Sequence, residues 1–301
     1  MSEANNIAAG DRLFSALAHI SILLGGVGPI VPAIIWVAKR RKSEYTSFQA
    51  LQALGYSIFY MFYILLVTLV LLIGFFVLVA SSSNRAGAAL GDLASLWMVG
   101  LFVIAIGLII LPVLLGIAGA LVCLFGKEFR YPMLGRRLAG YLRVGGVEGI
   151  DLDHEDRYVS AVAHACVMFI SPNLPYFIAT PLVTLLSSKG RSQLLHFQSL
   201  QALVFQLIGT AVSFGILMVM AGMFGLAMIL AGLNPITGAA ANSGSIPALI
   251  MLVAAVLIFL ISLLLLPLIQ TFGLVAGYRM LKGKEYEYPL VGKLVKGWSW
   301  I

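Results

Sequence analysis

The chain has 301 residues, of which 61% are hydrophobic and 10% are charged, and its formal net charge is +7. About a quarter of the residues of a soluble domain are charged, so this composition excludes an ordinary soluble globular protein. Two long segments, 93–125 and 192–278, contain no Asp, Glu, Lys or Arg. Because about 20 apolar residues cross a bilayer as a helix, and because this apolarity is continuous rather than alternating, the sequence predicts a polytopic all-α membrane protein.

The first predicted element, 13–38, is apolar but contains the sequence GGVGPIVP at 25–32. Glu3 and Asp11 precede the first basic residue, unlike a secretory signal peptide, so we expect this element to be retained. Proline lacks an amide donor and disfavours helix in the residue before it. The element is therefore either one kinked span or two short helices folded as a re-entrant hairpin.

Two predicted spans follow, at 54–80 and 93–125, and the second ends at the polar turn GKEFRYP, which starts at Gly126. Glycine commonly ends a helix, and we expect the lysine and glutamate of this turn to meet water and its aromatic residues to lie at headgroup level. The acidic segment GIDLDHEDR follows at 149–157. Its side chains could suggest a metal site, but a solvated linker is the simpler interpretation.

The same order of landmarks then returns. The sequence DRLFSALAH at 11–19 recurs as DRYVSAVAH at 156–164, and FQALQAL at 48–54 recurs as FQSLQAL at 197–203. The polar turn itself recurs as GKEYEYP, starting at Gly283. This order indicates a tandem duplication, which predicts three parts, listed as a first repeat at 1–147, an acidic linker at 148–156 and a second repeat at 157–301.

The second half therefore contains the same predicted elements as the first. Its initial apolar segment, 158–188, is interrupted by SPNLP at 171–175, and its two spans are expected at 203–230 and 247–278. Three spans in each half would invert the second half, whereas two spans and a re-entrant hairpin would keep both halves parallel.

The basic residues favour the parallel arrangement. In that arrangement, only Arg85 of the 19 Lys and Arg residues lies on the face opposite the termini. Basic residues in short loops prefer the cytoplasm. The sequence therefore predicts two parallel repeats, each a proline-broken re-entrant hairpin followed by two transmembrane helices. We expect both termini to be cytoplasmic and the membrane to be the bacterial inner membrane.

The repeated landmarks also resemble one known family over most of each half. The Ala-His start, the proline-broken apolar stretch, the Gln-Ala-Leu helix start and the closing Gly-Lys-Glu turn resemble bacterial relatives of the chloroplast inner-envelope protein-import component. Many of these relatives are small membrane proteins without an assigned function. The resemblance implies two such domains fused in one chain, with a role in protein insertion or translocation.

Histidines and glutamines recur at matching places in the two halves. Ionisable groups at membrane depth are expensive, so they are functional candidates by default. We expect a polar network at membrane depth made of His19, His164, Gln49, Gln52, Gln198 and Gln201. Hydrogen bonding that pins helices together is the favoured interpretation, and proton relay, transport and tetrapyrrole ligation are the alternatives.

Basic and aromatic residues follow the closing turn of each repeat. Amphipathic segments of this kind lie in the plane of the membrane interface and bind anionic lipid, which explains the basic charge better than nucleic acid does. The expected lipid contacts are Arg136, Arg137, Arg143, Lys293, Lys296, Trp298 and Trp300.

The sequence thus predicts a non-enzymatic scaffold or accessory subunit of a membrane complex, with anionic lipid and other membrane proteins as partners. Neither an activated nucleophile nor a pair of carboxylates within a span is present in the sequence, and we expect no cofactor or metal. Two alternatives remain, a small-molecule transporter or channel that uses the broken hairpins, and a tetrapyrrole-binding subunit.

Overall fold

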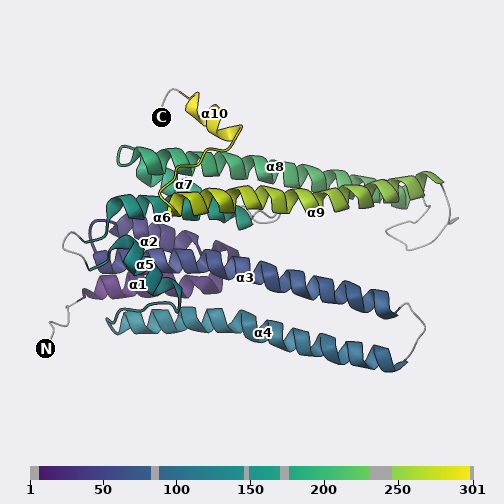
Figure 1. The fold of residues 1–301 in the computed structure, drawn as a ribbon, viewed down its shortest axis with the longest axis horizontal. Helices are drawn as coiled ribbons and strands as arrows, with labels where there is room; N and C mark the ends of the chain where they lie inside the picture. Colours follow the sequence, from purple (N-terminus) through teal and green to yellow (C-terminus); the bar gives the residue numbers. More distant parts are fainter. Residues whose placement is uncertain (1–6, 83–87, 146–148, 170–175, 231–245, 299–301) are drawn as a thin grey trace. The chain divides into compact units, whose positions relative to one another are not determined.

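The computed structural model describes residues 7–82, 88–145, 149–169, 176–230 and 246–298 (Figure 1). Every regular element in these ranges is a helix, and four of the helices are long and apolar enough to cross a membrane, judged by length and composition. They are α3 (Glu44–Ser82), α4 (Ala88–Leu124), α8 (Gln193–Leu230) and α9 (Ile246–Leu281). The predicted all-α polytopic fold is therefore confirmed.

The chain divides into two compact units, unit 1 at 1–162 and unit 2 at 163–301. This division lies inside helix α6 (Leu152–Ala165), whose first part packs within unit 1. The boundary between the units therefore differs from the acidic linker expected at 148–156. The repeat boundaries themselves, which come from the duplicated sequence, stay a prediction, and each unit is described by itself.

The broken first element of unit 1 forms two short helices, α1 (Ala9–Ile20) and α2 (Ile30–Lys39), joined by the 3-10 turn η1 (Ser21–Val27). Gly25 in this turn has a φ of 58°, a left-handed conformation that glycine adopts at no steric cost. Lys39 Nζ lies 2.8 Å from Asp11 Oδ1, so the end of α2 returns to the level at which α1 begins. Unit 1 therefore contains a hairpin that enters and leaves on one side.

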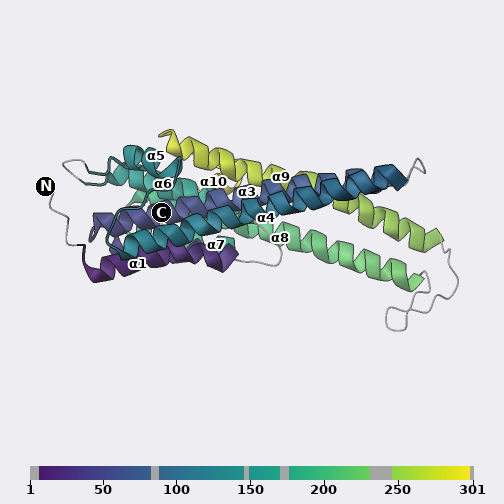
Figure 2. The ribbon, with the colours of Figure 1, turned by 90° about the horizontal axis from the view of Figure 1, so that it is seen from below.

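The hairpin packs against the first part of α3 and the last part of α4, and both long helices continue past it (Figures 1 and 2). The amide of Thr46 donates to Ser43 Oγ at 3.2 Å, which caps the start of α3. Phe48 and Leu51 are buried beside the hairpin, whereas Phe59 is 60% exposed. With 39 residues, α3 is about 58 Å long, roughly twice the hydrocarbon thickness of a bilayer.

Unit 2 contains the end of α6, the 3-10 turn η2 (Cys166–Phe169) and α7 (Tyr176–Ser188) before its two long helices. Helix α7 packs against α8, and η2 packs against α9. The predicted break SPNLP, at 171–175, lies outside the described residues.

A glycine brings the first element close to the last long helix in each unit. A side chain at Gly116 of α4 would lie 2.5 Å from Ile22 Cγ2, and one at Gly273 of α9 would lie 2.2 Å from Val167 Cγ1. No side-chain carbon tolerates such distances, so only glycine allows this approach without displacement of the neighbouring element.

A short helix follows the closing turn in each unit, α5 (Leu134–Leu142) in unit 1 and α10 (Val291–Lys296) in unit 2. Leu138 and Leu142 of α5 are 3% and 0% exposed, so the apolar side of this helix is buried against the protein. In α10, Val291 and Val295 are buried in the same way. Amphipathic pattern alone does not distinguish a face that packs on protein from one that lies in lipid, and in α5 the apolar face packs on protein.

Candidate functional site

His19 of α1 is the centre of a buried polar network in unit 1. Its side chain is 1% exposed, its Nδ1 lies 2.9 Å from the hydroxyl oxygen of Tyr131, and its Nε2 lies 2.8 Å from Gln49 Oε1. Tyr131 belongs to the closing turn GKEFRYP, and Gln49 lies near the start of α3. The histidine therefore joins the hairpin, the first spanning helix and the turn that follows the second.

The backbone of the closing turn determines how the two glutamine side chains of this network are oriented. Gln52 Oε1 accepts from the amide of Tyr131 at 3.2 Å, and Gln52 Nε2 donates to the carbonyl of Phe129 at 3.0 Å and to Gln49 Oε1 at 3.4 Å. Gln49 thus presents its oxygen to His19, whose Nε2 must carry the proton. When the imidazole is neutral, its Nδ1 accepts the hydroxyl hydrogen of Tyr131.

Unit 2 repeats the network with the same atoms in the same roles. His164 Nδ1 lies 3.1 Å from the hydroxyl of Tyr288, and His164 Nε2 lies 2.9 Å from Gln198 Oε1. Gln201 Oε1 accepts from the amide of Tyr288 at 3.2 Å, and Gln201 Nε2 donates to the carbonyl of Tyr286 at 3.2 Å. Two independent copies of one bonding pattern indicate that the whole pattern belongs to the fold of the repeat.

Both histidines lie outside the four spanning helices, and burial lowers the pKa of each to about 4. The hydrogen bond from each histidine to its glutamine opposes this shift only in part. Burial therefore favours the neutral form, in which Nε2 donates to the glutamine and Nδ1 accepts from the tyrosine hydroxyl.

Glycines and aromatic rings surround the network in both units. A side chain at Gly135 would lie 2.6 Å from Gln52 Oε1, and one at Gly292 would lie 3.0 Å from Gln201 Oε1. Tyr131 stacks on Tyr56 with ring centroids 3.7 Å apart, as Tyr288 stacks on Phe205 at 4.0 Å. Close packing on all sides fixes the position of the glutamines and leaves the histidines enclosed.

The structure brings together all six histidines and glutamines expected from the sequence, three in each unit. The sequence interpretation missed Tyr131 and Tyr288 as members of the network, and both are 2% exposed. The recurrence of the second aromatic residue in GKEFRYP and GKEYEYP was the signal that could have found them. The network also lies close to one end of the spans, because His19 meets Gly119 in the last turns of α4.

A comparison with protein-family models gives two matches in this chain, at residues 10–138 and 155–295. Both are to the magnetosome magnetite crystal formation protein family, MamF/MmsF, and together they cover most of the chain. The chain belongs to this family. No curated protein and no solved structure matches it. The double match supports the tandem duplication within a small membrane family, but nothing in it supports the relation to the chloroplast import component.

Each MamF/MmsF match contains a complete network. The first includes His19, Gln49, Gln52 and Tyr131, and the second includes the corresponding four residues of unit 2. The segment that is duplicated in this family therefore contains all the residues of one polar network. A chain with two MamF/MmsF domains therefore contains two such polar networks.

The second match starts at Glu155, in the segment expected to be a solvated linker. In this MamF/MmsF protein Glu155 is 1% exposed and Asp156 is 8% exposed, so that interpretation is wrong. Arg40 Nε donates to Glu155 Oε2 at 2.8 Å, and Arg40 also pairs with Asp156. Trp36 Nε1 donates to Glu155 Oε1 at 2.7 Å. Glu155 and Asp156 therefore form a buried ion cluster with Arg40 within unit 1, whereas Asp153 is exposed.

The basic side chains expected at the lipid interface have different surroundings. Arg136, Arg137 and Arg143 of unit 1 are exposed on the outer side of α5 and the residue after it. In unit 2, Lys296 pairs with Glu287, and Trp298 packs beside the buried residues of α10. Lys293 is exposed, and Trp300 lies outside the described residues. Contact of these residues with lipid stays a prediction.

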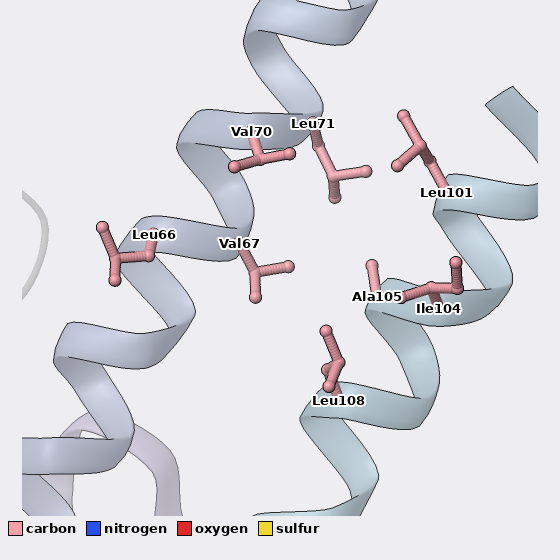
Figure 3. A pocket seen from close by; sticks show the side chains of 8 residues that line it. All are labelled: Leu66, Val67, Val70, Leu71, Leu101, Ile104, Ala105 and Leu108. Atoms are coloured by element: carbon pink, nitrogen blue, oxygen red, sulfur yellow. The ribbon is translucent and has the colours of Figure 1, made fainter. Parts of the chain in front are cut away.

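The described part of unit 1 also has an apolar cleft of about 170 Å³ between α3 and α4 (Figure 3). Val67 and Leu71 of α3 face Leu101 and Ala105 of α4 across it. Its lining is entirely apolar and does not include His19. The cleft could therefore hold a hydrocarbon chain, and none of its lining side chains has a polar or ionisable group.

Proposed function

We propose that this chain is a non-enzymatic integral membrane protein that takes part in magnetite crystal formation as a scaffold or accessory subunit of a membrane complex. The observation that carries the proposal is the match of both repeats to a family described by magnetosomes and magnetite crystal formation. The four long apolar helices agree with a multi-pass protein of the membrane in which such crystals form.

The hydrogen bonds of the two histidines support a structural role over transport or tetrapyrrole binding. Both ring nitrogens of His19 are engaged, and so are both ring nitrogens of His164. Ligation of a tetrapyrrole would require a tyrosine or a glutamine to leave, and would leave a buried polar group unpaired at a cost of about 1–3 kcal/mol. The groups that this protein offers to other molecules are instead its exposed basic and apolar surfaces.

The proposed location is the bacterial inner membrane with both termini in the cytoplasm. Single cysteines in place of Lys42 and Lys189 test this topology, in a background without Cys123 and Cys166. We expect a membrane-impermeant maleimide to label both positions only after the cells are opened, because both loops lie on the basic face. Labelling of one position in intact spheroplasts would contradict the parallel repeats.

Deletion of the coding sequence in the source bacterium tests the function. We expect fewer or smaller magnetite crystals in electron micrographs, with the wild-type phenotype restored when the full chain is supplied again. Crystals of normal size and number would contradict the proposal. Normal crystals together with co-purification of protein-insertion machinery in mild detergent would favour the role in protein insertion instead.

A further inference from the structure

The hairpin of unit 1 exposes large apolar side chains along its outer side. Leu13 and Leu17 of α1, Leu23 and Leu24 of η1, and Ile34 of α2 are between 42% and 56% exposed. Their neighbours on the same elements, Ala16, His19, Ile22 and Trp36, are buried against the rest of the unit. One side of the hairpin therefore packs against the protein, and its other, apolar side is exposed.

The turn of the hairpin marks how far it reaches along the spans. Ile22 packs with Tyr56 and Tyr60 of α3, next to Val113 of α4. Past this level α3 continues from Met61 to Ser82, a length of about 33 Å, which by itself matches a hydrocarbon core of about 30 Å. The turn of the hairpin therefore lies at the edge of the hydrocarbon core and its two helices extend into the headgroup layer of one leaflet, and in the described residues of unit 1 the opposite leaflet has no counterpart to them.

Charge on the same side identifies what covers the exposed apolar residues. Arg41, Lys42 and Lys127 are exposed beside the ends of the hairpin and of α4, where a lipid headgroup layer would lie. Each such residue contributes on the order of 1 kcal/mol of attraction to an anionic leaflet. Apolar side chains below a basic rim are the arrangement of an interfacial helix whose binding depends on membrane curvature.

We propose that the hairpin of unit 1 acts as a wedge in one leaflet and directs this protein to convex membrane surfaces. A unit with two spanning helices in both leaflets and two additional helices at the headgroup layer of only one leaflet displaces more headgroups on that side. Convex curvature spreads the headgroups of the outer leaflet, so it lowers the cost of accommodating the hairpin there. The partner is thus the anionic, convex leaflet of a small vesicle or tubule. This inference does not depend on the role in magnetite formation.

Tube pulling from giant vesicles measures the preference directly. The full chain, labelled with a fluorophore, is reconstituted in phosphatidylcholine vesicles that contain phosphatidylglycerol, and its orientation is determined by protection of a tag at the amino terminus. With the hairpin in the outer leaflet, we expect a protein density in the tube at least about twofold higher than in the flat membrane. With the opposite orientation we expect depletion. Equal densities, or enrichment in both orientations, would overturn the proposal.

A pair of variants separates the wedge from the spans. Leu23→Ala with Leu24→Ala removes exposed side chains from the hairpin, and Val99→Ala with Val103→Ala removes side chains of 62% exposure each from α4 beyond it. All four positions are exposed, so we expect unchanged unfolding midpoints for both variants. The hairpin variant is expected to lose most of the enrichment and the α4 variant to keep it. Retention of the full enrichment by the hairpin variant would overturn the proposal.

Discussion

Replacement of Arg40 by alanine is expected to destabilise this protein by about 3–5 kcal/mol, a large part of the stability of an ordinary domain. The guanidinium pairs with Glu155 and Asp156, and both carboxylates are almost fully buried. Glu155 would keep the hydrogen bonds from Trp36 and Ser47 but would lose its compensating charge. Unfolding of the purified chain in detergent, followed by circular dichroism as denaturant is added, measures the loss.

Arg143→Ala is the matched control for this prediction. Arg143 also pairs with an aspartate, Asp151 at 3.1 Å, but its side chain is 68% exposed and solvent screens the pair. We expect a change below about 1 kcal/mol. A double variant, Arg40→Ala with Glu155→Gln, should recover part of the loss because it removes one of the two uncompensated charges. Similar effects for Arg40→Ala and Arg143→Ala would show that the buried cluster contributes no more than a surface pair.

Acidification is expected to destabilise the chain between pH 7 and pH 5 through the two buried histidines. The pKa of each is lowered from 6.5 to about 4 by burial, so in this range the unfolded chain binds protons that the folded chain does not. The contribution of the neutral histidines is complete above pH 6.5 and is lost as the pH falls toward 4. At pH 5 the loss amounts to about 2 kcal/mol for each histidine.

Denaturant titrations at pH 7, 6 and 5 measure this pH dependence of the free energy of unfolding, which is called the slope below. His19→Gln and His164→Gln, made separately, are each expected to remove about half of it, whatever their effect on stability at pH 7. The two variants should behave alike because the two networks have the same partners in the same roles. A slope that survives in the double variant would mean that groups other than these histidines bind the protons.

The spans could be predicted from the sequence because a long apolar run such as 93–125 lies in lipid. In lipid its backbone hydrogen bonds must be made within the run, which requires a helix. The histidines and glutamines could be found because the duplication shows them twice. The role of Tyr131 was missed because the tendency of tyrosine to lie at headgroup level says nothing about a specific partner such as His19. The acidic segment was misread because its partner, Arg40, lies far away in the sequence, and local composition does not reveal a distant partner.

The apolar residues of α5 illustrate a different limit of sequence reasoning. Leu138 and Leu142 have the spacing of an interfacial helix, and the basic residues beside them complete the pattern. Burial against protein and burial in lipid satisfy the hydrophobic effect equally well, so periodicity cannot separate them. Only the tertiary arrangement around Gly135 and Gln52, which brings α5 onto α3, makes the distinction.

The ion cluster at Arg40 also limits how modular the duplication is. The sequence suggests a cut after residue 147, where one copy ends and a linker begins. A fragment cut there would contain Arg40 but neither Glu155 nor Asp156, which lie near the start of α6 and are the first two residues of the second family match. The two copies thus share an ion cluster although their sequences do not overlap. A fragment of the first copy that retains this cluster must therefore include the first residues of the second copy and extend at least through Asp156.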